Sequence, residues 1–256
     1  MSSGSDDNSN FQGKDDRVQS LRQLAKWRAT ARVLTEALPH ILRYDQKTVV
    51  VKYGGNAMGE EGVAEHFAQD IVLMRQVGMR PVVVHGGGPQ ISDLMGRLGK
   101  QSEFRNGLRV TDGETIDIVR MVLIGQVNPQ LVAAINVHGP LAVGVSGEDA
   151  GLIRAAARHV DLGFVGDVES INPTILNALL DDEFIPVVAT IGTDVDGQAY
   201  NINADTAAGA IANCSISANG CALGRSGGAA GVKQTGTMDN AASAAAIIQG
   251  SGACGA

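Results

Sequence analysis

The feature that most constrains the fold is a pair of apolar strands that each end in glycines. Residues 48–53 form a continuous β-branched run that stops at Gly54 and Gly55, and residues 81–84 form a second run that leads into Gly86–Gly88. Apolar runs without polar alternation are typical of strands buried on both faces of a parallel sheet. The two runs therefore predict neighbouring parallel strands whose carboxyl ends carry glycine loops.

Helical and strand patterns alternate along the body of the chain. Helices are expected over residues 60–77, 89–98, 114–124 and 128–136, and strands over 141–145, 164–168 and 185–188. Asn106-Gly107 predicts a hairpin turn within residues 104–110. This alternation predicts an α/β fold with a doubly wound, mainly parallel open sheet over residues 44–212.

The two ends of the chain have different patterns. Residues 1–16 are polar and acidic, which favours a disordered extension, and residues 17–43 hold an amphipathic helix whose apolar periodicity ends before Pro39. Its apolar stripe could dock on a partner subunit or on the chain's own core. Residues 213–256 are mostly glycine, alanine and serine, so they are expected to form a poorly packed tail with at most a short helix over 241–248.

Composition excludes several function classes. The formal net charge of −7 and the pI near 5.2 argue against nucleic acid as a partner. No uninterrupted apolar run approaches the roughly 20 residues of a membrane span. The three cysteines, all in the tail, have no zinc-ligand spacing, so we expect no metal site and a reduced, cytosolic setting.

The glycine loops point to an anion site. Backbone N–H groups of such loops can converge on an anion, and the dipole of the following helix favours negative charge. Lys52 ends its strand beside Gly54, where its ammonium is well placed to meet a phosphate. The spacing matches neither a P-loop nor a dinucleotide fingerprint. Tight turns alone could explain one loop, but the pair favours an anion site.

Further polar residues follow the later elements. Arg109, on the expected hairpin, could hold a carboxylate with both forks of its guanidinium, or equally form a surface ion pair. Asn201 and Asn203 could bind a ligand, and Asp205 lies in the first turn of a helix that begins at Ala204. His85 is interpreted as a hydrogen-bonded core residue and not as a base.

Five motifs together resemble the acetylglutamate kinases, a branch of the amino acid kinase family. They are KYGGNAM at 52–58, VHGGGPQ at 84–90, NGLRVT at 106–111, GFVGDV at 163–168 and NINADT at 201–206. The resemblance implies the amino acid kinase fold and transfer of the γ-phosphoryl of ATP, bound with Mg²⁺, to the side-chain carboxylate of N-acetyl-L-glutamate in arginine biosynthesis. No general base is required, because the acceptor is already ionised.

The resemblance also implies a role for each matched residue. Lys52 would stabilise the transferring phosphoryl group, and Asp205 would orient the lysines. Arg109 and Asn201 would hold acetylglutamate. Backbone N–H donors to the phosphoryl group and the substrate would come from four glycines: Gly54, Gly55, Gly87 and Gly88.

The tail departs from the family's C-terminal, nucleotide-binding lobe, which looks missing or degenerate. The family has a second lysine that faces the phosphates, and it lies in a glycine-rich motif of this lobe. Lys233, whose surrounding sequence matches that motif poorly, is the only candidate for this lysine. Such a tail is typical of a frame-shifted, mis-spliced or truncated end, and it leaves turnover by this chain open. A non-catalytic amino-acid-binding or oligomerising module is one alternative. A carbamate kinase-like enzyme is another, less favoured because carbamate has no α-carboxylate for Arg109 to clamp.

Partners follow from the same resemblance. The N-terminal helix resembles that of hexameric members, so a homo-oligomer is expected, a dimer or a hexamer joined through this helix. The body resembles the plant and cyanobacterial enzymes, some of which bind the PII signalling protein. The implied compartment is the cytoplasm, or the plastid stroma for a photosynthetic source.

Overall fold

The computed structural model describes residues 7–54, 62–105, 107–214, 221–222, 233–237 and 246–249. Its internal contacts divide the chain into two compact units, residues 1–45 and residues 46–256. The second unit contains both glycine loops and all the candidate site residues.

The first unit is the single helix α1, Asp7–Tyr44. The prediction of a disordered extension over 1–16 is therefore wrong for residues 7–16, while residues 1–6 lie outside the described residues. Acidic residue types at a helix start are stabilised by the helix dipole, so an acidic composition is compatible with a helix here. The predicted end before Pro39 is also wrong, because the helix continues through this proline even though its ring removes one backbone hydrogen bond.

The main sheet of the second unit has the strand order β12-β13-β1-β2-β8-β5, in which β12 is Lys233–Thr237 and β13 is Ala246–Gln249. Its other four strands are all parallel, and their bounds are β1 Thr48–Tyr53, β2 Arg80–His85, β8 Ile185–Ala189 and β5 Ala142–Ser146, the last at the edge of the sheet. Val51, Val83 and Val187 are fully buried. The mainly parallel sheet is therefore confirmed, together with the buried apolar strands from which it was predicted.

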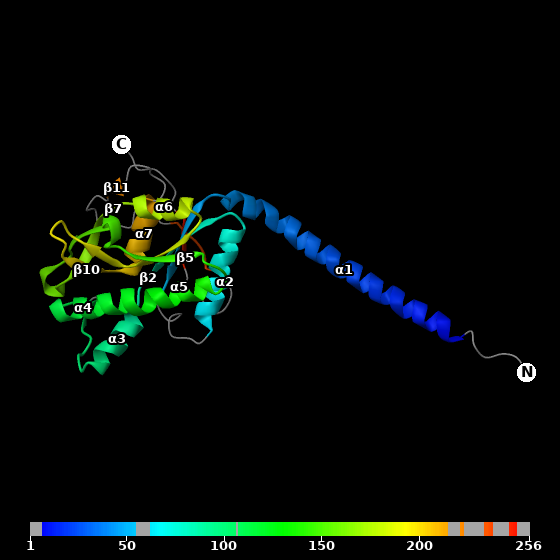
Figure 1. Ribbon diagram of the computed structural model, residues 1–256, viewed down its shortest axis with the longest axis horizontal. Coiled ribbons are helices and arrows are strands. Elements are labelled where there is room, and N and C mark those ends of the chain that lie inside the picture. The colour runs from blue at the N-terminus through cyan, green and yellow to red at the C-terminus, as the bar shows by residue number, and fades with distance from the viewer. Residues whose placement is uncertain are drawn as a thin grey trace, which may run out of the picture. The chain divides into compact units, whose positions relative to one another are not determined.

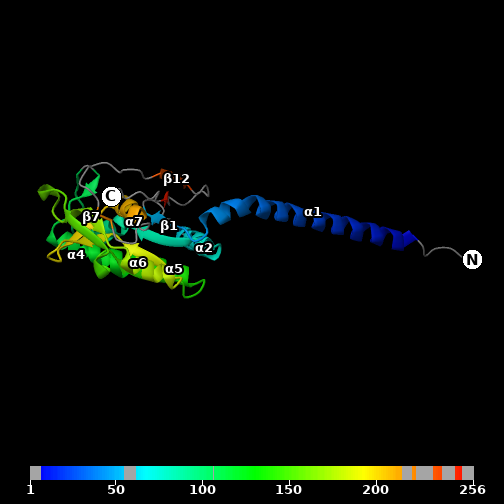
Figure 2. The ribbon, with the colours of Figure 1, turned by 90° about the horizontal axis from the view of Figure 1, so that it is seen from above.

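Helices cover both faces of this sheet (Figure 1). On one face α2, Val63–Gln76, contacts β2, and α5, Asn128–Asn136, contacts β8 and β5. On the other face α6, Thr174–Asp181, contacts β8, and α7, Ala204–Cys214, contacts β1 and β2. Figure 2 shows α7 beside β1. This arrangement confirms the doubly wound fold.

Two short strands of the tail extend the main sheet. β13, Ala246–Gln249, pairs antiparallel with β1, and β12, Lys233–Thr237, pairs with β13. The predicted helix over 241–248 is therefore wrong for residues 246–248, and its residues 241–245 lie outside the described residues. Ile247 and Ile248 align with the valines of β1, and a strand of four residues needs little apolar surface. Poor overall composition therefore did not prevent pairing.

A second, five-stranded sheet was not predicted. It contains β6 Ile153–Ala157, β7 Val165–Ile171, β9 Ile191–Thr193, β10 Ala199–Ile202 and β11 Cys221–Ala222. Of these, β7 was predicted, as the strand over residues 164–168. β6 contains three consecutive alanines, which favour helices, so pairing with β7 overrides local propensity there.

One long helical run crosses the domain where two helices were expected. α4, Gly113–Val122, continues through a π-helical turn, Leu123–Val127, into α5. By length and composition alone the run Gly113–Asn136 could cross a membrane, and it is the only such helix among the described residues. Of its most apolar window, 44% is buried inside the domain, and the buried residues of the run include Val119, Val122 and Leu131.

Gly163 provides a test of the packing between the two halves of this unit. Its φ is +66°, and an added Cβ would overlap the backbone oxygen of Thr111. Backbone hydrogen bonds of 2.7 and 3.0 Å tie Thr111 to Phe164 and Leu162. Gly163→Ala is therefore expected to destabilise the fold by about 2–4 kcal/mol. Urea unfolding measures this, and Gly96→Ala, in open space on helix α3, serves as the control, which is expected to stabilise the fold by about 0.5–1 kcal/mol.

Candidate functional site

The candidate residues lie at the carboxyl edge of the parallel strands. β1 and β2 end in register, with Tyr53 opposite His85. Gly54 follows the first strand and Gly86 follows the second. Both glycine loops therefore leave the same edge of the sheet, where ligands bind in open α/β folds.

Lys52 and Asp205 form an ion pair at this edge. Lys52 Nζ lies 3.2 Å from Asp205 Oδ1, and the lysine side chain is 16% exposed while the aspartate is 67% exposed. Asn203 Oδ1 accepts hydrogen bonds of 2.9 and 3.1 Å from the amides of Asp205 and Thr206, so Asn203 caps α7. The carboxylate of Asp205 thus holds the ammonium of Lys52 at the end of β1, while most of the aspartate side chain stays exposed to solvent.

The second glycine loop forms the start of α3, Gly88–Arg97. Gly87 precedes this helix and provides no side-chain cap. An added Cβ at Gly87 would lie 2.7 Å from Leu123 Cδ2, whereas one at Gly88 would meet nothing. Gly88 is exposed, so the uncapped helix start faces solvent and suits an anion. Gly55 and Asn106 lie outside the described residues.

Arg109 is buried on a short hairpin. This hairpin pairs β3, Phe104–Arg105, with β4, Leu108–Arg109, as predicted. The side chain donates hydrogen bonds to Ser92 Oγ at 2.8 Å, to the Gly88 carbonyl at 3.0 Å and to Ser102 Oγ. Its guanidinium carbon lies 4.7 Å from the centre of the Phe104 ring.

No carboxylate of the described residues forms an ion pair with Arg109. The alternative of a surface ion pair is therefore wrong within this part of the chain. Arg109 is only 6% exposed, and burial lowers the pKa of its guanidinium. A buried cation held by neutral groups lacks the compensation that such charges normally have. An incoming anion would supply it.

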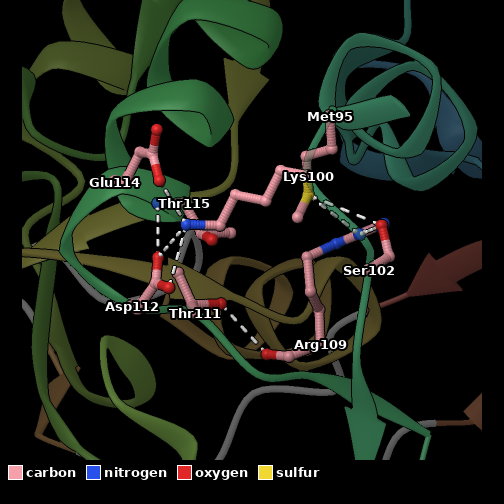
Figure 3. Close-up of polar contacts among 8 residues, drawn as sticks. All are labelled: Met95, Lys100, Ser102, Arg109, Thr111, Asp112, Glu114 and Thr115. Carbon is pink, nitrogen blue, oxygen red and sulfur yellow. Dashed lines mark hydrogen bonds and ion pairs between the residues drawn. The ribbon is translucent and has the colours of Figure 1, made fainter. Parts of the chain in front are cut away.

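An ion-pair cluster closes the base of this hairpin, as Figure 3 shows. Lys100 Nζ lies 2.8 Å from Asp112 Oδ1 and 2.7 Å from Glu114 Oε2. Asp112 also accepts a 2.8 Å hydrogen bond from the Thr115 amide at the start of α4. Hydrogen bonds from Lys100 and Thr115 lower the pKa of Asp112 to about 2. The segment that carries Arg109 is therefore tied at both ends.

Asn201 reaches the same region from β10. Its Nδ2 donates to Thr111 Oγ1 at 3.4 Å, and Thr111 Oγ1 donates to the Arg109 carbonyl at 3.0 Å. Thr111 is fully buried. The hydroxyl of Thr111 therefore links the side chain of Asn201 to the backbone of Arg109.

Short contacts join these groups into one site. A Cβ at Gly86 would lie 3.4 Å from Ala204 Cβ, which brings the glycine loop against the start of α7 and hence near Asp205. Gly88, on the same loop, accepts a hydrogen bond from Arg109. Lys233, in contrast, begins β12, which is separated from β1 by β13.

Three polar residues of this region are not among the candidates that the sequence patterns indicated. Ser92 and Ser102 bind Arg109, and Asn128 binds His85. Ser92 lies one helical turn after Gly88, so helical spacing could have placed it beside the glycine loop. Asn128 is buried, whereas the neighbouring amides Gln126 and Gln130 are exposed, and a buried polar side chain normally has a hydrogen-bond partner.

The site suits a phosphate ligand better than a bound metal ion. Among the described residues, no group of three His, Cys, Asp or Glu side chains could hold a metal. Lys52, the glycine loops and the α3 start supply positive charge and N–H donors, which fit the phosphates of a nucleotide. Asp205 is one exposed carboxylate, and Mg²⁺ is commonly bound by one or two carboxylates together with substrate phosphates.

Comparison with known proteins identifies the class. The model of the amino acid kinase family matches residues 47–223, and the chain belongs to this family. Acetylglutamate kinase from Jannaschia sp. (strain CCS1) is 55% identical over 185 residues, which are 72% of this chain and 65% of that protein. Acetylglutamate kinase from Hydrogenovibrio crunogenus is 56% identical over 195 residues, 71% of this chain and 65% of that protein. The chain thus spans just under two thirds of these relatives' length.

Solved structures support the same fold. The crystal structure of smu.665 from Streptococcus mutans UA159 matches with a TM-score of 0.59 and 31% identity, over 65% of this chain and 67% of that one. N-acetylglutamate synthase from Neisseria gonorrhoeae, solved with coenzyme A and N-acetyl-glutamate, matches with a TM-score of 0.59 and 24% identity. The match covers 70% of this chain and 42% of the synthase.

Proposed function

We propose that this chain is an acetylglutamate kinase, which transfers the γ-phosphoryl group of ATP to the side-chain carboxylate of N-acetyl-L-glutamate. The observation that carries the proposal is the buried Arg109, which neutral groups hold within contact of the glycine loop and which no described carboxylate neutralises. The relatives that share more than half of their aligned residues with the chain carry this name, and neither alternative function has such support.

The acceptor is held by its α-carboxylate in this proposal. Both terminal nitrogens of Arg109 already donate to neutral acceptors, which include Met95 Sδ. A carboxylate would therefore bind through Nε–H and one terminal nitrogen and displace a neutral acceptor from that nitrogen, and Asn201 adds an amide beside it. The side-chain carboxylate of the ligand then extends toward the glycine loop, because Arg109 contacts Gly88 at the loop's end. No protein base is needed, since this carboxylate is already a nucleophile at neutral pH.

The phosphoryl group is stabilised from the strand end. Charge builds on its oxygens as it passes between donor and acceptor, and catalysis of such a step depends on positioning and charge neutralisation. Lys52 supplies the positive charge, and Asp205 fixes the ammonium by the 3.2 Å ion pair. The amides of Gly54, Gly55, Gly87 and Gly88 supply further N–H donors. Mg²⁺ would arrive bound to ATP, and the exposed carboxylate of Asp205 beside Lys52 would help to hold it.

Calorimetry with two related ligands tests the acceptor site. N-acetyl-L-glutamate is titrated into the purified chain beside 4-acetamidobutyrate, which lacks only the α-carboxylate. We expect acetylglutamate to bind at least about 10-fold more tightly, because a bidentate pair to a desolvated arginine is lost with the analogue. Equal affinities for the two ligands would contradict the assignment of Arg109.

Gly54→Ala tests whether the strand-end lysine must lie close to the backbone. An added Cβ would lie 3.1 Å from Lys52 Cε and 3.3 Å from Lys52 Nζ, so the flexible end of the lysine is displaced while the fold tolerates the change. We expect kcat to fall by about 10-fold, in the range of a weakened transition-state contact, with Tm within about 2 °C. Steady-state kinetics and thermal unfolding, with Gly96→Ala as control, check this. An unchanged kcat would remove Lys52 from the transition state.

Assembly and regulation are further parts of the proposal. Dimers, or hexamers joined through α1, are proposed because this helix exposes seven large apolar residues: Leu21, Leu24, Trp27, Val33, Leu34, Leu38 and Leu42. Binding of the PII signalling protein rests on the resemblance alone. Sedimentation of the full chain beside a variant with Trp27 and Leu34 replaced by serine distinguishes an oligomer built through α1 from one built elsewhere.

A further inference from the structure

His85 occupies the point where the parallel sheet passes into the second glycine loop. It is the last residue of β2, and its side chain is fully buried. Its Nδ1 lies 2.9 Å from the Gly86 carbonyl oxygen, and its Nε2 lies 3.0 Å from Asn128 Nδ2. Both ring nitrogens are thus engaged, and neither faces solvent.

The hydrogen-bond partners define the state of the imidazole. Asn128 Nδ2 also lies 2.8 Å from the Val187 carbonyl, which can only accept, so the amide group that faces His85 is the NH₂. His85 Nε2 must therefore accept, and Nδ1 must carry the proton that it donates to Gly86. Burial lowers the pKa of His85 to about 4, which keeps the ring neutral at pH 7.

This hydrogen bond orients one peptide of the glycine loop. In a planar trans peptide the carbonyl and the following N–H point in opposite directions. Because the Gly86 carbonyl is turned toward His85, the Gly87 N–H is turned away from the ring. The preceding peptide is held as well, since Thr190 Oγ1 donates to the His85 carbonyl at 3.2 Å and the Gly86 N–H donates to Tyr53 at 3.4 Å.

Tight packing around Asn128 and Gly87 restricts the position of both residues. Asn128 follows directly after the π-helical turn, whose Leu123 and Val127 lie against the Gly87 position. On its other side, a Cβ at Gly144 would overlap Asn128 Oδ1. Local π-helical turns are frequent at functional sites. Here the π-helical turn packs against the glycine loop, and the next residue, Asn128, is the one that binds His85.

We propose that His85 and Asn128 are positioning residues, which hold the Gly86–Gly87 peptide so that the Gly87 N–H faces the transferring phosphoryl group. Asn128 selects the ring tautomer, and His85 Nδ1–H fixes the carbonyl. The expected effect on kcat rests on the proposed kinase function. The Nδ1–H tautomer of His85 does not depend on whether the chain turns over. Glycine alone cannot fix the loop, because its backbone has more conformational freedom than any other residue.

Two substitutions at His85 separate the two ring nitrogens. His85→Asn places an amide where Nδ1 lies and can still donate to Gly86, whereas His85→Gln places its amide near Nε2 and cannot. We expect kcat to fall on the order of 10–100-fold in His85→Gln and to stay within about 3-fold of wild type in His85→Asn. KM for acetylglutamate should change less than about 2-fold in both, because the Gly87 amide acts on the transition state.

The kinetic outcome is judged against stability. A purely structural histidine would make kcat follow the loss of Tm, with the smaller asparagine at least as damaging as glutamine. Equal kcat values in the two variants, or a rise in KM in place of a fall in kcat, would overturn the inference.

A second measurement needs no turnover. ¹⁵N chemical shifts of the His85 ring in the wild-type chain at pH 7 should show a protonated Nδ1 and a bare Nε2. An Nε2–H tautomer or a charged ring would overturn the inference even if the chain is active. A wild-type chain that shows the expected tautomer but forms no acetylglutamyl phosphate would contradict the proposed function and still support the positioning of the peptide.

Discussion

Replacing Lys52 by methionine is expected to lower kcat for acetylglutamate phosphorylation by at least about 100-fold, with KM for acetylglutamate changed by less than about 3-fold. The ammonium acts on charge that develops only in the transition state, and loss of one such group typically costs 10²–10³ in rate. Methionine keeps the unbranched stem of the lysine. The partner, Asp205, is 67% exposed and stays hydrated without the lysine, so Tm should change little.

Lys47→Met is the matched control for this change. Lys47 is exposed and precedes the opposite, amino-terminal end of the same strand β1. It should leave both kcat and KM unchanged. If Lys52→Met raised KM as much as it lowered kcat, the lysine would be a substrate anchor, and if it changed neither, the lysine would lie outside the site.

Arg109→Lys is expected to weaken N-acetyl-L-glutamate binding by on the order of 2 kcal/mol, which is about 30-fold in Kd. A lysine ammonium cannot present two parallel donors to a carboxylate. It also loses the contacts of the guanidinium plane with the Phe104 ring and with Ser92 and Ser102. Calorimetric titration measures the change directly.

Arg105→Lys provides the control on the same hairpin. Arg105 is exposed and pairs with Glu103, so its replacement should leave the affinity within about 2-fold. An Arg109→Lys chain that binds acetylglutamate as tightly as wild type would make Arg109 a structural residue of the hairpin and would reopen the carbamate kinase-like alternative.

The main sheet and its glycine loops could be predicted because local pattern and tertiary environment agree there. A β-branched run such as residues 48–53 suits a strand buried on both faces, and the following Gly54 marks the ligand edge. The hairpin of Arg109 was predictable for the same reason, since Asn106-Gly107 specifies its turn. Where propensity and context agree, sequence patterns therefore locate the candidate site as well as the fold.

The missed elements are those in which context overrides propensity. β6 is an alanine-rich strand that pairs with β7 on one side and with β9 on the other, and β13 is a four-residue strand in a segment of poor composition. Pairing partners distant in sequence are invisible to a local pattern.

The contacts around the site depend on distant packing in the same way. Arg109 was left between a ligand contact and an ion pair, and its buried position among neutral groups depends on Ser92 of α3 and Ser102 of the preceding loop. Asn128 lies 43 residues from His85 along the chain, and the two meet only in the folded domain.

Trapping of the acyl phosphate tests the central claim most directly. The purified chain is incubated with ATP, Mg²⁺, N-acetyl-L-glutamate and hydroxylamine, and the hydroxamate of the product is measured for wild type and for Lys52→Met. The kinase proposal predicts hydroxamate from wild type and almost none from the variant, whereas a tail that cannot form a nucleotide lobe would give no measurable product from either. No hydroxamate from a wild-type chain that binds N-acetyl-L-glutamate in the calorimeter would contradict the kinase proposal and favour a non-catalytic amino-acid-binding module.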